Sequence, residues 1–215
     1  MHGRRLAPAV AALLLLVASA PGPAGAAPRR RCIVPSGADV LARGEGTVVW
    51  RLRGTRDAPA DFLPVYGCRR GQRRFLIQRL EANEGFVDEV VRARATRRFG
   101  AIVVRQIDHY GCASTTATSA DLRRRRTVTR VFLGSTFCSE PFDAIRVPDL
   151  VVSRSGALGA TLDTRGHREI LTARGRHAAP VMVAGGPALD LRSLTLTGAE
   201  MAWREDGERR STSLP

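Results

Sequence analysis

A short apolar strand that begins with glycine recurs four times in this chain, and this repetition constrains the fold more than any other feature of the sequence. The four copies are Gly46–Trp50, Gly100–Val104, Gly156–Ala160 and Gly198–Trp203. Successive copies begin 54, 56 and 42 residues apart. Periods of this size are typical of repeat architectures, in which each unit buries its apolar face only against its neighbours. The chain is therefore expected to fold as a row of similar units.

The rarest aromatic residues follow the same repetition. Both tryptophans, Trp50 and Trp203, end a glycine-led strand. Both tyrosines, Tyr66 and Tyr110, begin a Tyr-Gly-Cys triplet, and the two triplets lie 44 residues apart. These placements suggest equivalent positions in different units.

A basic strand with alternating apolar residues is predicted after each glycine-led strand, beyond a turn or loop. These strands are Arg73–Ile77, Thr127–Leu133, His167–Leu171 and Arg209–Leu214. Asp206-Gly207 separates the last two strand patterns, and Asp-Gly in that position is the strongest short-range signal of a β-hairpin. The segment Asp163–Gly166 predicts a similar turn one unit earlier.

A further strand is expected before each hairpin, which gives three or more strands per unit. Such strands are visible at Leu150–Val152 and Leu194–Leu196, and Val87–Arg94 fits the same pattern. A helix over Glu81–Ala95 competes with the last of these, although Gly85 and the valines weaken that reading. No other segment has a sustained 3.6-residue period, so the predicted class is all-β.

The order of elements over Asp149–Leu214 carries a family resemblance. A strand, a glycine turn, an Ala-Trp strand, an Asp-Gly turn and an Arg-rich strand follow one another. This order resembles the repeats of secreted TolB-like and WD-type β-propeller proteins. The resemblance implies a propeller-like array of about four or five antiparallel sheets, which can be incomplete because each blade takes about 40–45 residues. A β-sandwich is the alternative fold.

The first 26 residues have the three parts of a secretory signal peptide. Arg4 and Arg5 are charged, Ala9–Ala20 is apolar, and Ala24–Ala26 supplies a small-residue cleavage site. The sequence thus predicts export, with residues 27–215 as a single secreted domain on the extracellular or cell-envelope side. No later apolar run approaches the roughly 20 residues of a spanning helix, so no transmembrane segment is predicted in the mature chain.

The four cysteines, Cys32, Cys68, Cys112 and Cys138, all follow the predicted leader. An even number of cysteines in an oxidising compartment predicts two disulfides. Three pairings are open, and we favour Cys32 with Cys68 and Cys112 with Cys138 because sequential loops close at the lowest entropic cost. The cysteines lack the close spacing of a zinc site, so no metal is predicted there.

The chain is strongly basic, with a formal net charge of +14. Removing Arg4 and Arg5 with the leader leaves +12, and every basic residue is arginine. The densest cluster, Arg123, Arg124, Arg125 and Arg126, is the candidate anion-binding site, with a solvated loop as the alternative. Proteins that bind single-stranded nucleic acid have aromatic residues within the basic groove. No aromatic residue lies in Arg123–Arg130, so nucleic acid is disfavoured as the partner.

No catalytic residue or cofactor is predicted from the sequence. Ser153–Gly156 does not match the nucleophile elbow of serine hydrolases. Neighbours on a strand point to opposite faces, so Asp108 could not orient His109 as a triad acid does. His167 and Glu169 share a predicted strand face, with His177 ten residues beyond His167, but no third clustered ligand accompanies them. The lack of a catalytic motif favours a non-enzymatic protein, but the sequence does not decide the question.

The leading expectation is an exported, non-enzymatic β-repeat module for binding a macromolecule or associating with the cell envelope. The first alternative is a secreted hydrolase acting on carbohydrate or peptide, with carboxylates that meet only in the fold. The second alternative is a binder of anionic polymers, such as those of the cell envelope, through the Arg-rich surface. All three require the fold to bring distant residues together.

Overall fold

The computed structural model describes residues 32–53, 62–83, 85–136, 138 and 145–214. These residues form β-strands joined by turns and loops, and they contain no helix. The all-β prediction is confirmed. The predicted signal peptide, residues 1–26, lies outside the described residues.

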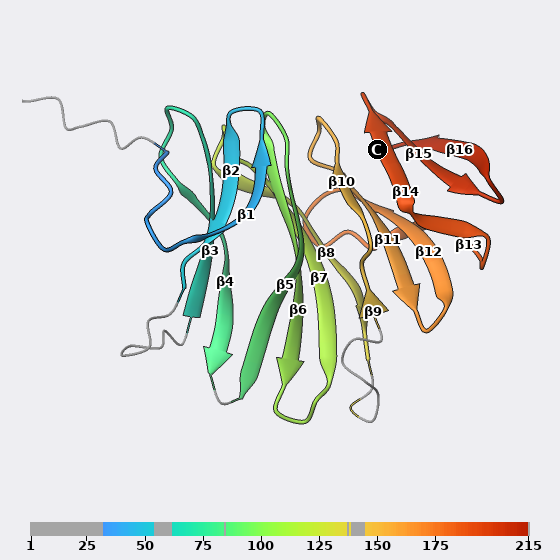
Figure 1. The fold of residues 1–215 in the computed structure, drawn as a ribbon, viewed down its shortest axis with the longest axis horizontal. Helices are drawn as coiled ribbons and strands as arrows, with labels where there is room; N and C mark the ends of the chain where they lie inside the picture. Colours follow the sequence, from blue (N-terminus) through green and yellow to red (C-terminus); the bar gives the residue numbers. More distant parts are fainter. Residues whose placement is uncertain (1–31, 54–61, 84, 137, 139–144, 215) are drawn as a thin grey trace, which may run out of the picture.

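The strands form three antiparallel sheets (Figure 1). The first has eight strands in chain order: β1 (Asp39–Gly44), β2 (Thr47–Arg51), β3 (Phe62–Arg69), β4 (Phe75–Asn83), β5 (Phe86–Ala95), β6 (Phe99–Asp108), β7 (Ala113–Asp121) and β8 (Arg126–Ser135). The second contains β9 (Ile145–Arg146), β10 (Leu150–Val152), β11 (Leu158–Thr164), β12 (His167–Ala173) and β13 (Val181–Gly185). The third contains β14 (Leu189–Thr197), β15 (Glu200–Glu205) and β16 (Glu208–Ser213).

All the strands predicted from the sequence are present. The glycine-led segments lie in or lead into β2, β6, β11 and β15, and the basic segments overlap β4, β8, β12 and β16. The competing helix over Glu81–Ala95 is wrong. Residues 86–95 form β5, which pairs with β6 from Phe86–Asp108 to Ala95–Gly100. The β-branched residues of β5 therefore follow their strand propensity.

The repeat is longer than the sequence pattern indicates in its first two copies. A strand intervenes between the glycine-led strand and the basic strand, β3 in the first copy and β7 in the second. The two Tyr-Gly-Cys triplets are not equivalent. Tyr66 lies within β3, whereas Tyr110 lies in the turn between β6 and β7. Their shared spacing is therefore no sign of a structural repeat.

Both hairpin turns predicted from Asp-Gly patterns are confirmed. Glu205 pairs with Glu208 across a two-residue turn. Asp206 and Gly207 both have positive φ, 52° and 78°. Two positive φ values define the type I′ turn, whose twist matches that of the flanking strands. The β11–β12 turn has the same form at Arg165 and Gly166.

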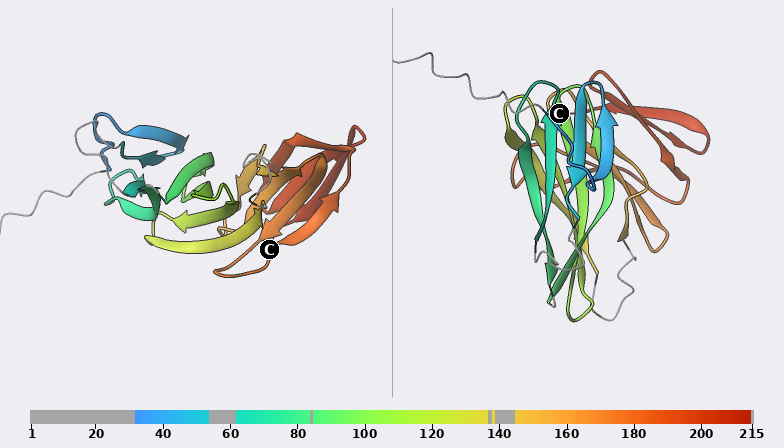
Figure 2. Two further views of the ribbon diagram at one scale, coloured as in Figure 1. Left: turned by 90° about the horizontal axis from the view of Figure 1, so that it is seen from below. Right: turned by 60° about the vertical axis from the view of Figure 1, so that its left-hand side comes forward.

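The eight-stranded sheet folds back on itself between β4 and β5. Only two residue pairs, Ala82–Val87 and Asn83–Phe86, join these strands. The halves face each other across a core that includes Val49, Leu80 and Ile102. We call β1–β4 layer 1, β5–β8 layer 2, β9–β13 layer 3 and β14–β16 layer 4. The layers follow one another in chain order (Figure 2, left).

The central strands of the middle layers, β6 and β11, are buried on both faces over most of their length. Phe99, Ala101 and Val103 of β6 face layer 3, where they pack with residues such as Leu150 and Leu158. The alternate residues of β6 face layer 1. Successive side chains of a strand point to opposite faces, so the apolar run of β6 serves both cores. Layer 3 likewise contacts layer 4 through its opposite face, in a separate core.

Both predicted disulfides are confirmed. Cys32 is bonded to Cys68, with the Cα atoms 5.7 Å apart. Cys112 is bonded to Cys138, with a Cα separation of 4.0 Å. The first bond ties the segment before β1 to β3, beside the buried Trp50. The second ties the β6–β7 turn to the chain that follows β8.

Candidate anion-binding surface

Six turns of the antiparallel sheets lie at the same end of the layers, which we call the turn end (Figure 1). They join β1 to β2, β3 to β4, β5 to β6, β7 to β8, β10 to β11 and β14 to β15. In an antiparallel sheet alternate connections fall at one edge, so residues far apart in sequence meet there. All four layers contribute to this surface.

Arginines are concentrated in these turns. They are Arg69, Arg70, Arg73 and Arg74 around the β3–β4 turn, Arg97 and Arg98 in the β5–β6 turn, Arg123–Arg126 around the β7–β8 turn, and Arg154 in the β10–β11 turn. Carboxylates are few: Glu45 lies in the β1–β2 turn, Asp121 ends β7, and Glu200 begins β15. The described part of the turn end is therefore strongly positive.

A cleft of about 710 Å³ opens among these turns, and we call it the end cleft. Its charged lining residues are Glu45, Arg69, Arg97, Arg98, Arg123 and Arg154. Its other lining residues are Thr96, Phe99, Val152, Ser153, Leu196 and Gly198. The cleft thus takes residues from all four layers. Five arginines that line one concave surface favour an anionic ligand.

The predicted cluster Arg123–Arg126 lies at this end, and the structure divides it. Arg123 lines the end cleft. Arg124 and Arg125 are exposed in the same turn, and Arg126 is the exposed first residue of β8. Arg69, Arg97, Arg98 and Arg154 belong to the same surface, and the sequence alone did not indicate this. Short basic runs at turns were the available signal, but only the fold brings those turns together.

Asp121 fixes the turn that carries Arg123. Its side chain is 1% exposed. Its Oδ1 accepts hydrogen bonds from the backbone N–H groups of Arg123 at 3.0 Å and Arg124 at 2.9 Å. Its Oδ2 accepts from Arg98 Nε at 3.0 Å and from Nη2 at 2.5 Å. One buried carboxylate therefore holds the backbone of one turn and an arginine of the neighbouring turn.

Two opposing effects act on the Asp121 carboxyl. Burial raises the pKa of Asp121, but the hydrogen bonds from Arg98 and from the turn amides lower it, and the net shift is downward. The pairing also raises the pKa of the Arg98 guanidinium. Asp121 is therefore a stable anion whose charge is neutralised by Arg98.

Asp121→Asn is expected to destabilise the protein by about 2 kcal/mol at neutral pH, the scale of a charge-assisted hydrogen bond. Because the folded-state pKa is lowered, this stabilisation is present above the ordinary value of 3.8 and is lost as the pH falls through the folded value. Urea unfolding from about pH 7 to about pH 2 should show the gap between the two proteins closing. A gap that stays constant with pH would contradict this role.

The β10–β11 turn is held from its interior. The Gly156 carbonyl accepts hydrogen bonds from Ser119 Oγ at 2.5 Å and Thr129 Oγ1 at 2.9 Å. Ser153 Oγ accepts from the backbone N–H of Ala157 at 3.1 Å. These contacts tie the turn bearing Arg154 to β7 and β8. The arginine therefore projects from a fixed backbone.

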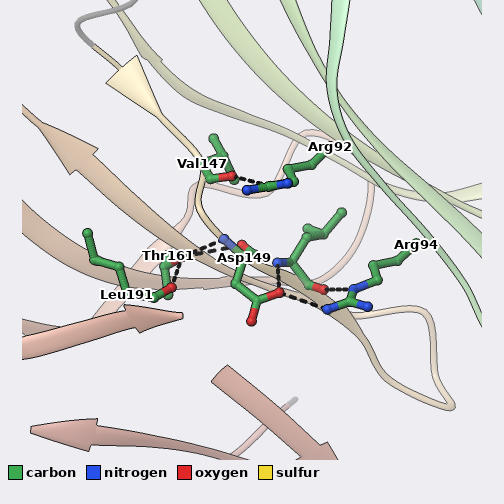
Figure 3. A network of polar contacts seen from close by, with 7 residues as sticks. Arg92, Arg94, Val147, Asp149, Thr161 and Leu191 are labelled. Atoms are coloured by element: carbon green, nitrogen blue, oxygen red, sulfur yellow. Dashed lines mark hydrogen bonds and ion pairs between the residues drawn. The ribbon is translucent and has the colours of Figure 1, made fainter. Parts of the chain in front are cut away.

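A polar network joins the layers along their first strands (Figure 3). Arg92 Nε donates to the Val147 carbonyl at 2.8 Å, and Arg94 Nη2 forms an ion pair with Asp149 Oδ1 at 3.0 Å. Thr161 Oγ1 accepts a hydrogen bond from the Asp149 backbone N–H at 2.8 Å and donates one to the Leu191 carbonyl at 2.9 Å. The two arginines join layer 2 to layer 3, and Thr161 joins layer 3 to layer 4. We therefore do not count them as part of the candidate ligand surface.

The other candidate residues do not form a shared site. His109 is exposed in the β6–β7 turn, where Asp108 Oδ1 accepts from the backbone N–H groups of Tyr110 and Cys112 at 2.9 Å each. His167 and Glu169 line one small cavity, whereas His177 lines a different one. Within the described ranges, no three His, Cys, Asp or Glu side chains are grouped as metal ligands.

No family model matches the chain, and no curated protein matches its sequence. The two disulfides are compatible with the predicted secretion. Among the described residues, no helix is long and apolar enough to cross a membrane.

Proposed function

We propose that this protein is an exported, non-enzymatic β-repeat module that binds an anionic polymer at its turn end. The observation that carries the proposal is the end cleft, which is lined by five arginines from turns of three layers and by one carboxylate, Glu45. Asp121 neutralises one of these arginines, Arg98, but the arginines still outnumber the carboxylates. This proposal combines the leading expectation from the sequence, a binding module, with its second alternative, a binder of anionic polymers. The hydrolase alternative stays a prediction.

A propeller-like array of four blades is part of this proposal. In support, β1 contacts β5, β5 contacts β10, and β10 contacts β14, so these four strands, one from each layer, adjoin in series. The innermost strands of propeller blades have this relation. No pairing joins β16 to β1 in the described part of the chain, so we infer an open array. Such an array presents its turns as one continuous surface.

A polymer fits this surface better than a single small anion. Arg70, Arg73 and Arg74 lie exposed on one side of the end cleft, and Arg124 and Arg125 lie exposed in the β7–β8 turn. A polyanion that runs along such a row releases one condensed counterion for each charge that it pairs. The described turn end offers few aromatic platforms for bases. We therefore favour a phosphate-rich or sulfate-rich envelope polymer over nucleic acid.

The test is a titration of the purified protein with teichoic acid, heparin and single-stranded DNA at about 50 and 200 mM salt. We expect tight binding of at least one non-nucleic polyanion, with affinity that falls by at least tenfold at the higher salt. Absence of binding to all three polymers at the lower salt would overturn the proposal. Neutral dextran serves as the control polymer.

A further inference from the structure

A second cleft, of about 550 Å³, opens along the side of layers 1 and 2, and we call it the side cleft. It forms where β4 and β5 stop pairing, and its lining comes from β4 to β8 and from residues 176–177 of the loop after β12. Most of its lining side chains are amides, hydroxyls or charged groups. Its volume is in the range of ordinary ligand pockets.

Asp88 of β5 lies at the point where the two strands separate. It is 8% exposed, and its Oδ2 accepts a hydrogen bond from the Glu81 backbone N–H at 2.9 Å. Its Oδ1 is buried and accepts no hydrogen bond of good geometry from the described residues, although the Gln106 side chain lies close enough to lower the pKa of the carboxyl. A buried carboxylate oxygen without a hydrogen-bond donor lowers the stability of the fold. Such an atom usually has a partner, here a ligand or a water molecule.

Polar residues continue from Asp88 across the sheet on the same face. Asp88 is opposite Gln106 of β6, and Gln106 is opposite Ser114 of β7. On the far side of the side cleft, Gln78 Oε1 accepts a hydrogen bond from Thr118 Oγ1 at 3.5 Å. The row therefore offers both donors and acceptors at spacings fixed by the sheet.

The charges around the side cleft argue against an ionic ligand. Arg79, Arg130 and Arg176 oppose an organic cation, while Asp88 and Glu81 oppose an anion. Burial raises the pKa of Asp88, and the nearby Glu81 charge adds to the rise, whereas the Glu81 amide and the Gln106 side chain oppose it. The preferred ligand is thus neutral and rich in hydroxyl groups.

We propose that the side cleft binds a neutral oligosaccharide, with Asp88 Oδ1 accepting a hydrogen bond from a sugar hydroxyl. Gln106, Ser114 and Gln78 supply the neighbouring hydrogen bonds. The site is separate from the end cleft, since the two share no lining residue. The protein would then hold a charged polymer at its turn end and a neutral glycan at its side.

The test is a binding screen of the whole protein against neutral oligosaccharides of two to six residues, such as chitin, cellulose and dextran fragments, followed by calorimetry. We expect at least one to bind, and Asp88→Asn to weaken it at least tenfold, because the amide keeps the shape but changes the hydrogen-bonding group at this position. Gln106→Ala should also weaken it while leaving the Asp88–Glu81 bond intact. Asp190→Asn, at an exposed carboxylate outside the side cleft, is the matched control and should bind normally.

Three results would overturn the proposal. These are binding to none of the oligosaccharides, equal affinity in Asp88→Asn and Asp190→Asn, or displacement of the sugar by heparin. Thermal unfolding of each variant establishes that it is folded. If the protein still binds the sugar after serine replaces the end-cleft arginines, the two sites are separate. Failure of the polyanion proposal would then leave the oligosaccharide proposal standing.

Discussion

Replacing Arg97, Arg123 and Arg154 together with serine is expected to weaken polyanion binding on the order of 100-fold at low salt. All three line the end cleft and are exposed. Each phosphate or sulfate contact that is lost removes about 0.7–0.9 from the slope of log K against log salt, so the slope should fall by about two to three. Fluorescence titrations at four salt concentrations measure both quantities.

A matched control separates local binding from overall charge. Arg204, Arg209 and Arg210 lie exposed on β15 and β16, and their replacement with serine removes the same charge. We expect less than about a threefold loss, because exposed charges beyond a Debye length of about 8–10 Å are largely screened. Equal losses in the two triple variants would mean that the protein attracts polyanions only through its net charge.

Gly156→Ala is expected to destabilise the fold by about 3–4 kcal/mol, the largest loss we predict for a single substitution. Gly156 has a φ of +91°, which L-residues rarely adopt. A Cβ atom there would lie 2.7 Å from Val128 Cγ1 and 2.9 Å from Phe99 Cε1. Strain and overpacking therefore add. Equilibrium urea unfolding of the two proteins measures the difference.

Gly198→Ala is the control for the strain alone. Gly198 has a φ of +68°, and nothing lies within 4 Å of a Cβ atom at this position. We expect a loss of about 1–2 kcal/mol, the cost of the left-handed conformation. If both variants lose the same free energy, the packing between the β10–β11 turn and layer 2 is looser than the structure indicates.

The strands could be predicted from the sequence because their signals are local. Asp206-Gly207 sets a type I′ turn through two positive φ values, and the register in which β16 pairs with β15 follows from it. The segments β3 and β7 could not be assigned to the repeat in this way. Pro64 interrupts the first pattern, and β7 is rich in Thr, Ser and Ala, small residues that fit only between two packed layers.

The candidate surfaces were harder to predict because they depend on which turns share an end. Arg123–Arg126 stood out as a run, whereas Arg97 and Arg154 gained significance only when β5, β7 and β10 placed their turns together. Asp88 had no sequence signal. Its burial follows from the place where β4 leaves β5, and that place is set by packing between layers 1 and 2.

The most direct test of the central claim is to map the polyanion on the protein by amide chemical shifts. On titration with a short heparin or teichoic acid fragment, we expect the shifted amides to lie in residues 45–46, 69–74, 96–98, 122–126 and 153–156. Shifts confined to those turns would place the ligand at the turn end. Shifts spread over all faces, or concentrated on β15 and β16, would contradict the account.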